Sequence, residues 1–389
     1  MSTRRRNLET MGQRPRSTFR AFGGWLLIIA AFIVTARSAY AFTALDDYVA
    51  APDPSFSATP VFSTPLPGFR VDLLDMTSQT WRSASEVNRT EWQHYVTIIT
   101  PDVLLNDTAM LFVDGGNNSS TPPALGDSGY DQQIGFLSQM ALGAGSVVVH
   151  LPTIPNEPLT FLDDGIPRTE DGIISYTLDK YLNEHPNLGD NTWPLLLPMV
   201  KSAVRAMDVA QSQVPSINDF VVAGGSKRGW TTWLTAAVDA RVKAVIPASI
   251  DFLNLDEQLL HHKEVYEGVT DFTVGGYSAA IGDYVAYDIP ARLNTPAGQD
   301  LLEIIDPYEY RDRLTMPKYL LNSAGDEFFP SDSMQFYFDE LSGQNLVRYV
   351  PNTGHGQNDE AIQSAAFLFA AFANDLPLPE YSWTVEDGG

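Results

Sequence analysis

The sequence has no cysteine among its 389 residues, and this absence narrows the possible chemistry first. Disulfides, thiolate metal sites and cysteine nucleophiles are all excluded. Histidine is also scarce, so a general base or an imidazole metal ligand must come from six residues. No Walker motif and no G-x-G-x-x-G fingerprint occurs, and we expect neither a cofactor nor a bound metal. The six histidines are His94, His150, His185, His261, His262 and His355.

The N-terminus has the three parts of an export signal. Six arginines precede the apolar stretch GGWLLIIAAFIVTA, which is shorter than the ~20 residues that a membrane span needs. SAYA follows, with Ala39 and Ala41 at the small positions of an A-x-A cleavage site. We expect residues 1–41 to be a signal peptide that is removed before Phe42, and the protein to be secreted or periplasmic with no stable membrane anchor. An uncleaved anchor is the alternative.

Positive charge is scarce in the rest of the chain. The whole sequence has 24 basic and 48 acidic residues, and the signal removes seven arginines and one glutamate. That leaves 17 basic and 47 acidic residues, a net charge of −30, which repels nucleic acid and anionic membranes. A hydrophobic content of 44% excludes global disorder. The expected partner is therefore a small-molecule or peptide-like substrate, not a nucleic acid.

Short apolar runs alternate with helical patterns over residues 68–376. The runs FRVDLLDM and HYVTIITP resemble an antiparallel pair, and six later runs are mostly apolar, as strands covered on both faces are. Helical periodicity occurs at 194–213, 231–240, 331–341 and 359–375. This alternation predicts an α/β fold with a mostly parallel central sheet and helices on both faces. The six runs lie at 109–116, 146–152, 219–225, 242–249, 318–325 and 346–352.

Four segments depart from this alternation. Residues 42–67 are rich in proline, which predicts a surface lead-in, and residues 377–389 form the expected C-terminal tail. Residues 250–316 separate two expected strands by far more than a crossover needs, which predicts a lid insertion. A second excursion, 153–192, is a candidate to line the same entrance.

The stretch FVVAGGSKRGW stops a buried strand at Ser226 and starts a helix at once. A serine hydroxyl needs a base to take its proton, and a sharp strand–serine–helix turn raises the hydroxyl above the strand end. Small residues must flank the serine for this turn to close, and Gly224 and Gly225 precede it. The stretch departs from the G-x-S-x-G pattern because Arg228 stands two positions after the serine and Gly229 three. The alternative is a serine that only caps the helix.

An acid and a histidine follow the last two expected strands. In α/β-hydrolases the nucleophile, the acid and the histidine follow late strands in this order. KYLLNSAG ends at Asp326, and LVRYVPN leads into TGHG, which contains His355. We predict that His355 is the base for Ser226 and that Asp326 orients its imidazole. Asp251, after the preceding strand, is the alternative acid.

Two places can supply donors for the oxyanion of an acyl-transfer reaction. The amide of Lys227 opens the helix after the serine. The loop in FVDGGNN offers a second donor through Gly115 or Gly116, and its Asn117 is a candidate contact with substrate. A plain turn is the alternative, because D-G-G-N-N is strong turn chemistry.

Charged and imidazole side chains near these motifs are further candidates. Lys227 and Arg228 oppose the dipole of the helix that they begin. Either acidic residues pair with them, or one of them, with Arg228 as the candidate, binds a substrate carboxylate. The spacing of His261 and His262 matches no familiar metal site, and His261 is instead a candidate contact with substrate.

Several stretches together resemble a known family, the PhoPQ-activated pathogenicity-related proteins. They are GGSKRGWTTWLTAAVDARVKAVIP, WPLLLPMVKSAVRAMD, DPYEYRDRLTMPKYLLNSAGDEFFPSDS and RYVPNTGH, and the resemblance covers roughly residues 43–380. This secreted or periplasmic group also includes an autocrine proliferation repressor. The resemblance implies an α/β-hydrolase core with Ser226, Asp326 and His355 as its triad, and it makes Arg228 a family feature.

The expected function is that of a secreted serine hydrolase. It would cleave an ester or amide bond through an acyl-enzyme on Ser226. The alternative is a secreted binding or signalling protein on a hydrolase scaffold, related to virulence or proliferation. Loss of function on Ser226→Ala would separate the two.

Overall fold

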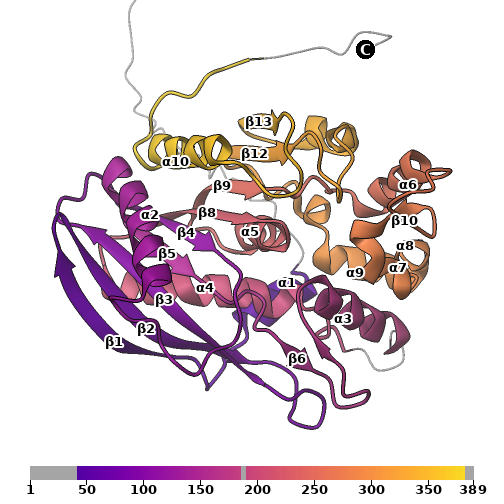
Figure 1. Ribbon diagram of the computed structural model, residues 1–389, viewed down its shortest axis with the longest axis horizontal. Helices are drawn as coiled ribbons and strands as arrows, with labels where there is room; N and C mark the ends of the chain where they lie inside the picture. The colour runs from indigo at the N-terminus through magenta and orange to yellow at the C-terminus, as the bar shows by residue number, and fades with distance from the viewer. Residues whose placement is uncertain (1–41, 185–189, 382–389) are drawn as a thin grey trace, which may run out of the picture. The chain divides into compact units, whose positions relative to one another are not determined.

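A nine-stranded sheet forms the centre of the structure, a computed structural model that describes residues 42–184 and 190–381 (Figure 1). The strand order is β1-β2-β3-β5-β4-β8-β9-β12-β13. Pairing is antiparallel from β1 to β3 and between β3 and β5, and parallel across the other strands. The expected opening pair and mostly parallel sheet are confirmed. The strands are β1 (Ser57–Leu66), β2 (Phe69–Thr80), β3 (Glu91–Pro101), β4 (Thr108–Val113), β5 (Val148–Leu151), β8 (Asp219–Gly225), β9 (Val242–Ala248), β12 (Lys318–Ser323) and β13 (Asn345–Val350).

The predicted signal peptide, residues 1–41, lies outside the described residues, as do residues 382–389 of the predicted tail. In the part of the chain that is described, no helix is both long enough and apolar enough to span a membrane.

Helices cover both faces of the sheet, and this explains the apolar runs of the strands. Side chains of successive strand residues point to opposite faces. In β8, Val221 packs with the layer that contains α2 and α10, whereas Val222 packs with the layer that contains α1, α4 and α5. Both valines are fully buried, so neither face of the strand needs polar residues. The helices are α1 (Ala44–Ala50), α2 (Ser128–Ala144), α4 (Leu196–Gln213), α5 (Lys227–Val238) and α10 (Asp359–Ala373).

The segment 42–67, predicted as a surface lead-in, contains the helix α1 and the strand β1, which is mostly exposed. Thr43 and Asp46 form a capping box at the start of α1, and Leu45 is completely buried under the α4 side of the sheet. Asp46 also pairs with Arg313 at 2.9 Å. The prolines gave no sign of a strand here, yet β1 tolerates them because it is an edge strand, where a missing amide donor costs little.

The insertion at 250–316 is a group of short helices that packs against α3 (Asp171–Glu184). Tyr284 donates to Asp171 at 2.9 Å, and Arg292 pairs with Asp179 at 2.6 Å. Figure 1 shows these elements beside α3, away from β1 to β3. They are α6 (Leu255–Tyr266), β10 (Thr273–Val274), β11 (Tyr277–Ser278), η1 (Ala279–Ile281), α7 (Gly282–Ala286), α8 (Ile289–Arg292), α9 (Pro296–Ile305) and η2 (Pro307–Tyr310).

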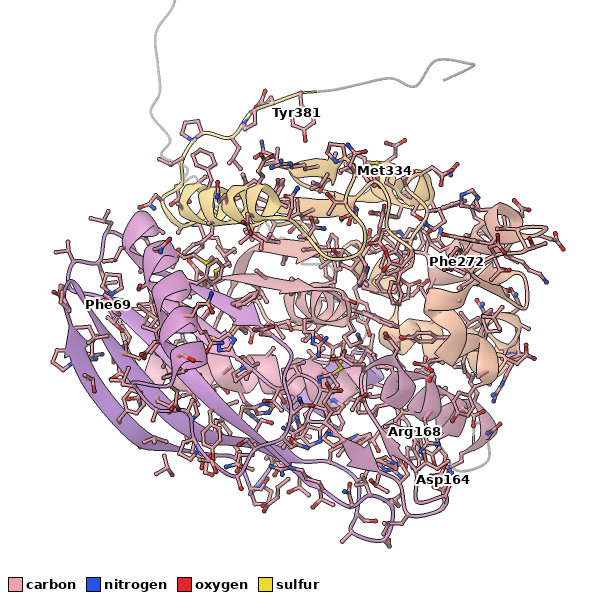
Figure 2. All side chains as sticks on the ribbon, viewed as in Figure 1. Phe69, Asp164, Arg168, Phe272, Met334 and Tyr381 are labelled. Carbon is pink, nitrogen blue, oxygen red and sulfur yellow. The ribbon has the colours of Figure 1, made fainter. Side chains whose placement is uncertain are left out.

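The second excursion, residues 153–192, carries a two-stranded ribbon ahead of α3. β6 (Leu159–Thr160) pairs antiparallel with β7 (Pro167–Arg168). Figure 2 labels Arg168 and Asp164 at this ribbon, where their side chains form an ion pair at 2.5 Å. The Arg168 guanidinium also stacks 3.9 Å from the ring centroid of Tyr176 in α3. These contacts tie the ribbon to the helix that follows it.

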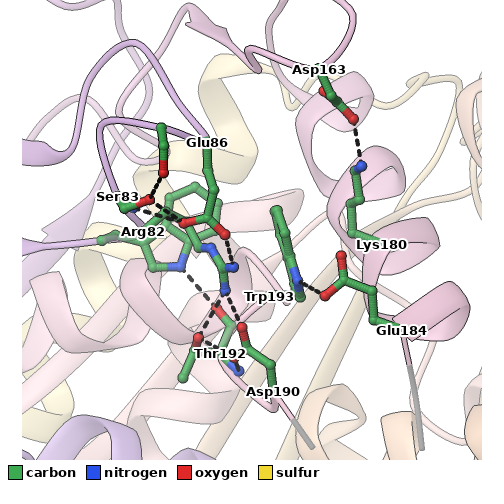
Figure 3. Close-up of polar contacts among 11 residues, drawn as sticks. Arg82, Ser83, Glu86, Asp163, Lys180, Glu184, Asp190, Thr192 and Trp193 are labelled. Carbon is green, nitrogen blue, oxygen red and sulfur yellow. Dashed lines mark hydrogen bonds and ion pairs between the residues drawn. The ribbon is translucent and has the colours of Figure 1, made fainter. Parts of the chain in front are cut away.

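Arg82, in the loop after β2, contacts residues at the C-terminal end of this excursion (Figure 3). Its guanidinium pairs with Asp190 at 2.7 Å and lies 3.6 Å from the ring centroid of Trp193. The indole of Trp193 in turn donates to Glu184 at 2.7 Å. The excursion is therefore held to the sheet on one side and to the insertion on the other.

The helix expected at 331–341 is replaced by two short 3-10 turns, η3 (Ser333–Phe336) and η4 (Phe338–Glu340). Tyr337 separates them with φ −151°, outside the helical region, and is almost completely buried. Its hydroxyl donates to Asp251 at 2.5 Å. A buried tyrosine that reaches a specific acceptor overrides the helical periodicity of this stretch. The other three expected helices are confirmed as α4, α5 and α10.

Candidate active site

Ser226 stands on the turn between β8 and α5, in a backbone conformation that L-residues rarely adopt. Its φ is +57° and its ψ −129°, which stores on the order of 1–3 kcal/mol of strain. A hydrogen bond from its amide to the carbonyl oxygen of Ala248, 2.8 Å long, holds the turn to β9. Its hydroxyl makes no capping bond to α5. The alternative in which the serine only caps the helix is therefore wrong.

Two glycines let this turn close although the sequence lacks the usual pattern. A Cβ on Gly224 would lie 2.6 Å from the carbonyl oxygen of Arg228. A Cβ on Gly229 would lie 2.6 Å from Cγ2 of Ile250 and 3.0 Å from the Gly224 oxygen. The close helix–strand contact thus needs its second glycine three positions after the serine, and Arg228 is accommodated in the position before it.

The structure brings Ser226, His355 and Asp326 together. The Ser226 Oγ lies 2.8 Å from His355 Nε2. His355 Nδ1 lies 2.9 and 3.0 Å from the two carboxylate oxygens of Asp326. Asp326 follows β12 and His355 follows β13, so all three side chains meet at the carboxyl edge of the parallel strands. The carboxylate side chain is 3% exposed and the imidazole 19%, which leaves the imidazole accessible at the serine.

Asp251, the alternative acid, is occupied elsewhere. It accepts hydrogen bonds from the hydroxyls of Tyr337 and Tyr349 and is 2% exposed. Burial raises its pKa to about 6, although the two tyrosines lower it. Among the described residues, the carboxylate that contacts the His355 ring is that of Asp326.

The loop that carries His355 is fixed by its neighbours. The amide of His355 donates to Glu327 at 2.9 Å, and its carbonyl oxygen accepts from the Ser249 hydroxyl at 2.7 Å. The ring of Phe328 lies against the imidazole, with centroids 4.2 Å apart. Gln357 bonds Ser249 from the far side at 2.7 Å. These contacts fix the backbone of the loop and one face of the ring, and Asp326 holds the ring at Nδ1.

The candidate oxyanion donors have different surroundings. Lys227 is the first residue of α5, and its amide donates to no acceptor among the described residues. The Gly115 amide instead donates to the Asp114 carboxylate at 2.8 Å. Gly116 has φ +125°, a conformation that favours glycine, and no acceptor for its amide is recorded in the described residues. The Gly115 amide is thus engaged, and the free donors are those of Lys227 and Gly116.

Gly115 has another role, because a Cβ there would meet the guanidinium of Arg228 at 2.7 Å. That guanidinium binds Glu170 with two hydrogen bonds of 2.8 Å and also donates to the carbonyl oxygen of Ile154. Of the two alternatives for Arg228, pairing with an acid is the one observed. The structure does not support the contact with a substrate carboxylate that was predicted for Arg228, because this side chain is bound to Glu170 and does not border the cavity at Ser226.

Lys227 joins the same cluster of charges. Its ammonium lies 2.7 Å from Glu170 and 3.3 Å from Asp171. Burial raises the pKa of Glu170, but Arg228 and Lys227 outweigh burial and hold that pKa well below its usual range. Burial and the neighbouring Glu170 raise the pKa of Glu157. The sequence showed that the cations needed partners but not which acids they were.

The predicted substrate contacts Asn117 and His261 do not border the cavity at Ser226. Asn117 is exposed, and its backbone forms an isolated β-bridge with the backbone of Glu157. His261 pairs with Asp332 at 2.9 Å. The neighbouring His262 does border the cavity: it is 3% exposed, and neither ring nitrogen has a hydrogen-bond partner in the described residues. Burial lowers its pKa to about 4, so it is neutral at physiological pH.

An apolar cavity of about 80 Å³ borders the Ser226 hydroxyl. Its walls are formed by residues of α3, α5, the insertion and the segment after Asp326, so the insertion and the second excursion border the same cavity. Part of its aromatic wall is Phe328 and Phe329 of the stretch DEFFPSD. Because these aromatic residues lie so close to Asp326 in the sequence, they could have been recognised as candidates. The wall residues include Trp230, Phe252, Leu259, Tyr284, Phe328 and Phe329.

The strand order and the three side chains at its carboxyl edge define an α/β-hydrolase fold. Two solved structures share this fold at 14% sequence identity. Acetyl xylan esterase 1 from Thermoanaerobacterium sp. JW/SL YS485 superposes with a TM-score of 0.56, covering 84% of this chain and 91% of its own. The acetyl xylan esterase from Paenibacillus sp. R4 gives a TM-score of 0.53 with the same coverage of both chains.

The chain belongs to the PhoPQ-activated pathogenicity-related protein family, whose sequence profile matches residues 45–389. A relative, autocrine proliferation repressor protein A of Dictyostelium discoideum, is 36% identical over 354 residues. The match covers 88% of this chain and 68% of the relative. The resemblance drawn from GGSKRGW and its companion stretches is thus confirmed.

Proposed function

We propose that the protein is a secreted serine hydrolase that cleaves an ester or amide bond through an acyl-enzyme. The observation that carries the proposal is the chain of contacts from Ser226 Oγ to His355 Nε2, 2.8 Å, and from His355 Nδ1 to Asp326, 2.9 Å. The strained turn at Ser226 supports it, because strain of this kind concentrates at functional sites. The fold shared with two esterases supports a hydrolase scaffold.

Each of the three side chains has a defined task in this mechanism. His355 takes the proton of Ser226 while the hydroxyl oxygen attacks the carbonyl carbon, and Asp326 holds the imidazole and stabilises its charged form. The Lys227 amide donates to the negative oxygen that develops. The imidazolium then protonates the leaving alcohol or amine. Water, deprotonated by His355, finally attacks the acyl carbon, and the imidazolium returns the proton to Ser226 Oγ as the bond between Oγ and the acyl group breaks.

Secretion is part of the proposal and rests on the basic, apolar and A-x-A parts of residues 1–41. A second candidate function is that of a secreted binding or signalling protein on the same scaffold, related to proliferation or virulence. The observation that favours it is the name of the relative with 36% identity, an autocrine proliferation repressor. The two candidates differ in whether function requires the Ser226 hydroxyl.

The experiment is labelling of the purified protein with a fluorophosphonate probe, which reacts only with an activated serine. We expect the wild type to label and Ser226→Ala and His355→Ala not to label. Ser119→Ala, at an exposed serine that bonds only its own loop, is the matched control and should label as the wild type does. Absence of labelling in a wild type with intact circular dichroism would reject the hydrolase in favour of the binding protein.

A further inference from the structure

The apolar cavity at Ser226 carries an inference about the substrate, which rests on the proposed hydrolase function. Its walls include Trp230 of α5, Leu178 of α3 and, from the insertion, Phe252 and Leu259. With Phe328 and Phe329, which follow Asp326, four separate parts of the chain line the cavity that borders Ser226. An apolar space that borders a nucleophile is suited to bind the apolar part of its substrate.

The size of the cavity limits what can enter. A single buried water needs roughly 10–15 Å³ of such volume, so a cavity of about 80 Å³ has space for roughly five to eight non-hydrogen atoms. An acetyl group has only one carbon beyond its carbonyl to place in the cavity. A hexanoyl or benzoyl group would fill the cavity.

The charges at the cavity wall are already compensated. Lys227 pairs with Glu170 and Asp171, and Asp171 also accepts from the Tyr284 hydroxyl at 2.9 Å. The amide nitrogen of Gln258 donates to two backbone carbonyl oxygens. An ionised group in the cavity would lose its water without gaining a free counter-charge, which is strongly unfavourable. The cavity therefore discriminates against charged groups.

The acyl half of the substrate fits this place better than the leaving group. His355 must reach the leaving atom to protonate it, yet His355 is not among the described residues that line the cavity. The leaving group must also depart before water attacks, whereas the acyl group stays on Ser226. We propose that the cavity binds the acyl half and selects an uncharged, apolar acyl group of roughly five to eight non-hydrogen atoms.

The first test is a series of p-nitrophenyl esters from acetate to decanoate, with benzoate and the monosuccinate. We expect kcat/KM to rise about fourfold per methylene from acetate to hexanoate and to fall again by decanoate. The monosuccinate should be at least tenfold slower than the pentanoate. A second series keeps the acetyl group and lengthens the alcohol, and should vary less than threefold. A maximum at acetate, or a dependence on the alcohol instead of the acyl chain, would overturn the proposal.

Adjacent leucines on α6 provide matched variants. Leu259 lines the cavity, whereas Leu260 is 48% exposed and does not line it. Leu259→Trp should lower the hexanoate-to-acetate ratio of kcat/KM at least tenfold, and Leu260→Trp should leave that ratio unchanged. Leu259→Ala should move the preferred chain to a longer one. Equal ratios for Leu259→Trp and Leu260→Trp would contradict the assignment of the cavity.

Binding to Ser226→Ala separates this inference from the proposed function. By calorimetry, hexanamide should bind this variant at least tenfold more tightly than acetamide, and Leu259→Trp should remove the difference. Failure of fluorophosphonate labelling would reject the hydrolase while this selectivity could still hold. Equal affinity of the two amides would reject the cavity selectivity even in an active enzyme.

Discussion

The two sides of Ser226 are built on opposite principles. On one side, Arg228 and Lys227 meet Glu170 through charge-assisted hydrogen bonds of 2.7–2.8 Å, and Gly115 leaves space for the guanidinium. On the other side, residues of the insertion, α3, α5 and the segment after Asp326 line a cavity whose surface is mostly apolar. Directional bonds fix geometry, whereas apolar contact depends mainly on area and shape. The polar side therefore holds the elbow in place, and the apolar side is free to set specificity.

The largest effect is expected at Asp326, the carboxylate that contacts the His355 imidazole. Asp326→Asn should lower the second-order rate constant of fluorophosphonate labelling by about 10³- to 10⁴-fold, because the amide favours the wrong imidazole tautomer and cannot stabilise the charged imidazole. Asp251→Asn, at the carboxylate that binds two tyrosines instead, should change that rate less than tenfold. The reverse order of effects would make Asp251 the functional acid.

Next in size is the effect of closing the space behind the elbow. Gly229→Ala should reduce the free energy of unfolding by about 2–3 kcal/mol, because the new Cβ would lie 2.6 Å from Ile250 and 3.0 Å from the Gly224 oxygen. Gly225→Ala is the control, since its Cβ would meet nothing nearer than 4.0 Å. Urea unfolding measures both. Equal stability of the two variants would show that the elbow adapts to a side chain.

The ion cluster can be weakened without removing charge. Arg228→Lys should lower the free energy of unfolding by about 1–2 kcal/mol, because an ammonium cannot bind Glu170 with two parallel bonds and also reach Ile154. The value is below that of a fully buried pair because the Glu170 side chain is 42% exposed. Arg311→Lys, in a more exposed pair with Glu340, should change stability by less than about 0.5 kcal/mol. Equal losses of stability in the two variants would show that the guanidinium of Arg228 has no special role.

The burial of His262 in the cavity wall should make the stability of the protein depend on pH. Because burial lowers the pKa of His262 from 6.5 to about 4, the unfolded chain binds more protons between those values. The stability that this residue contributes is complete above pH 6.5 and is lost as the pH falls towards 4, at up to about 1.4 kcal/mol per pH unit. His262→Gln should flatten the pH dependence of unfolding by that slope. An unchanged slope would place the imidazole in water.

Local patterns predicted the sheet and the three contacting side chains well. β8 could be recognised because Val221 and Val222 are both buried, one on each face. Asp326 and His355 could be assigned to Ser226 because each follows a strand of this kind, and parallel strands place their carboxyl ends together. A pattern that repeats along the chain was enough for these predictions.

Contacts between distant segments were not predictable in the same way. Glu170 and Arg228 are 58 positions apart, and no local pattern pairs them. Helix α2 was not expected, since three glycines at 129, 135 and 143 weaken its helical signal and only packing on the sheet stabilises it. His261 was preferred to His262 because a sequence does not show which of two adjacent side chains faces a cavity.

Strand β1 gives the sheet a protected border. A free strand edge invites pairing with another chain, and long exposed edges lead to aggregation. Pro60 and Pro65 remove two donors from this edge, and the register shifts between Pro60 and Phe62. A second copy of the sheet therefore finds no continuous row of donors and acceptors on β1. The prolines of this stretch therefore interrupt the edge at which another strand could add to the sheet.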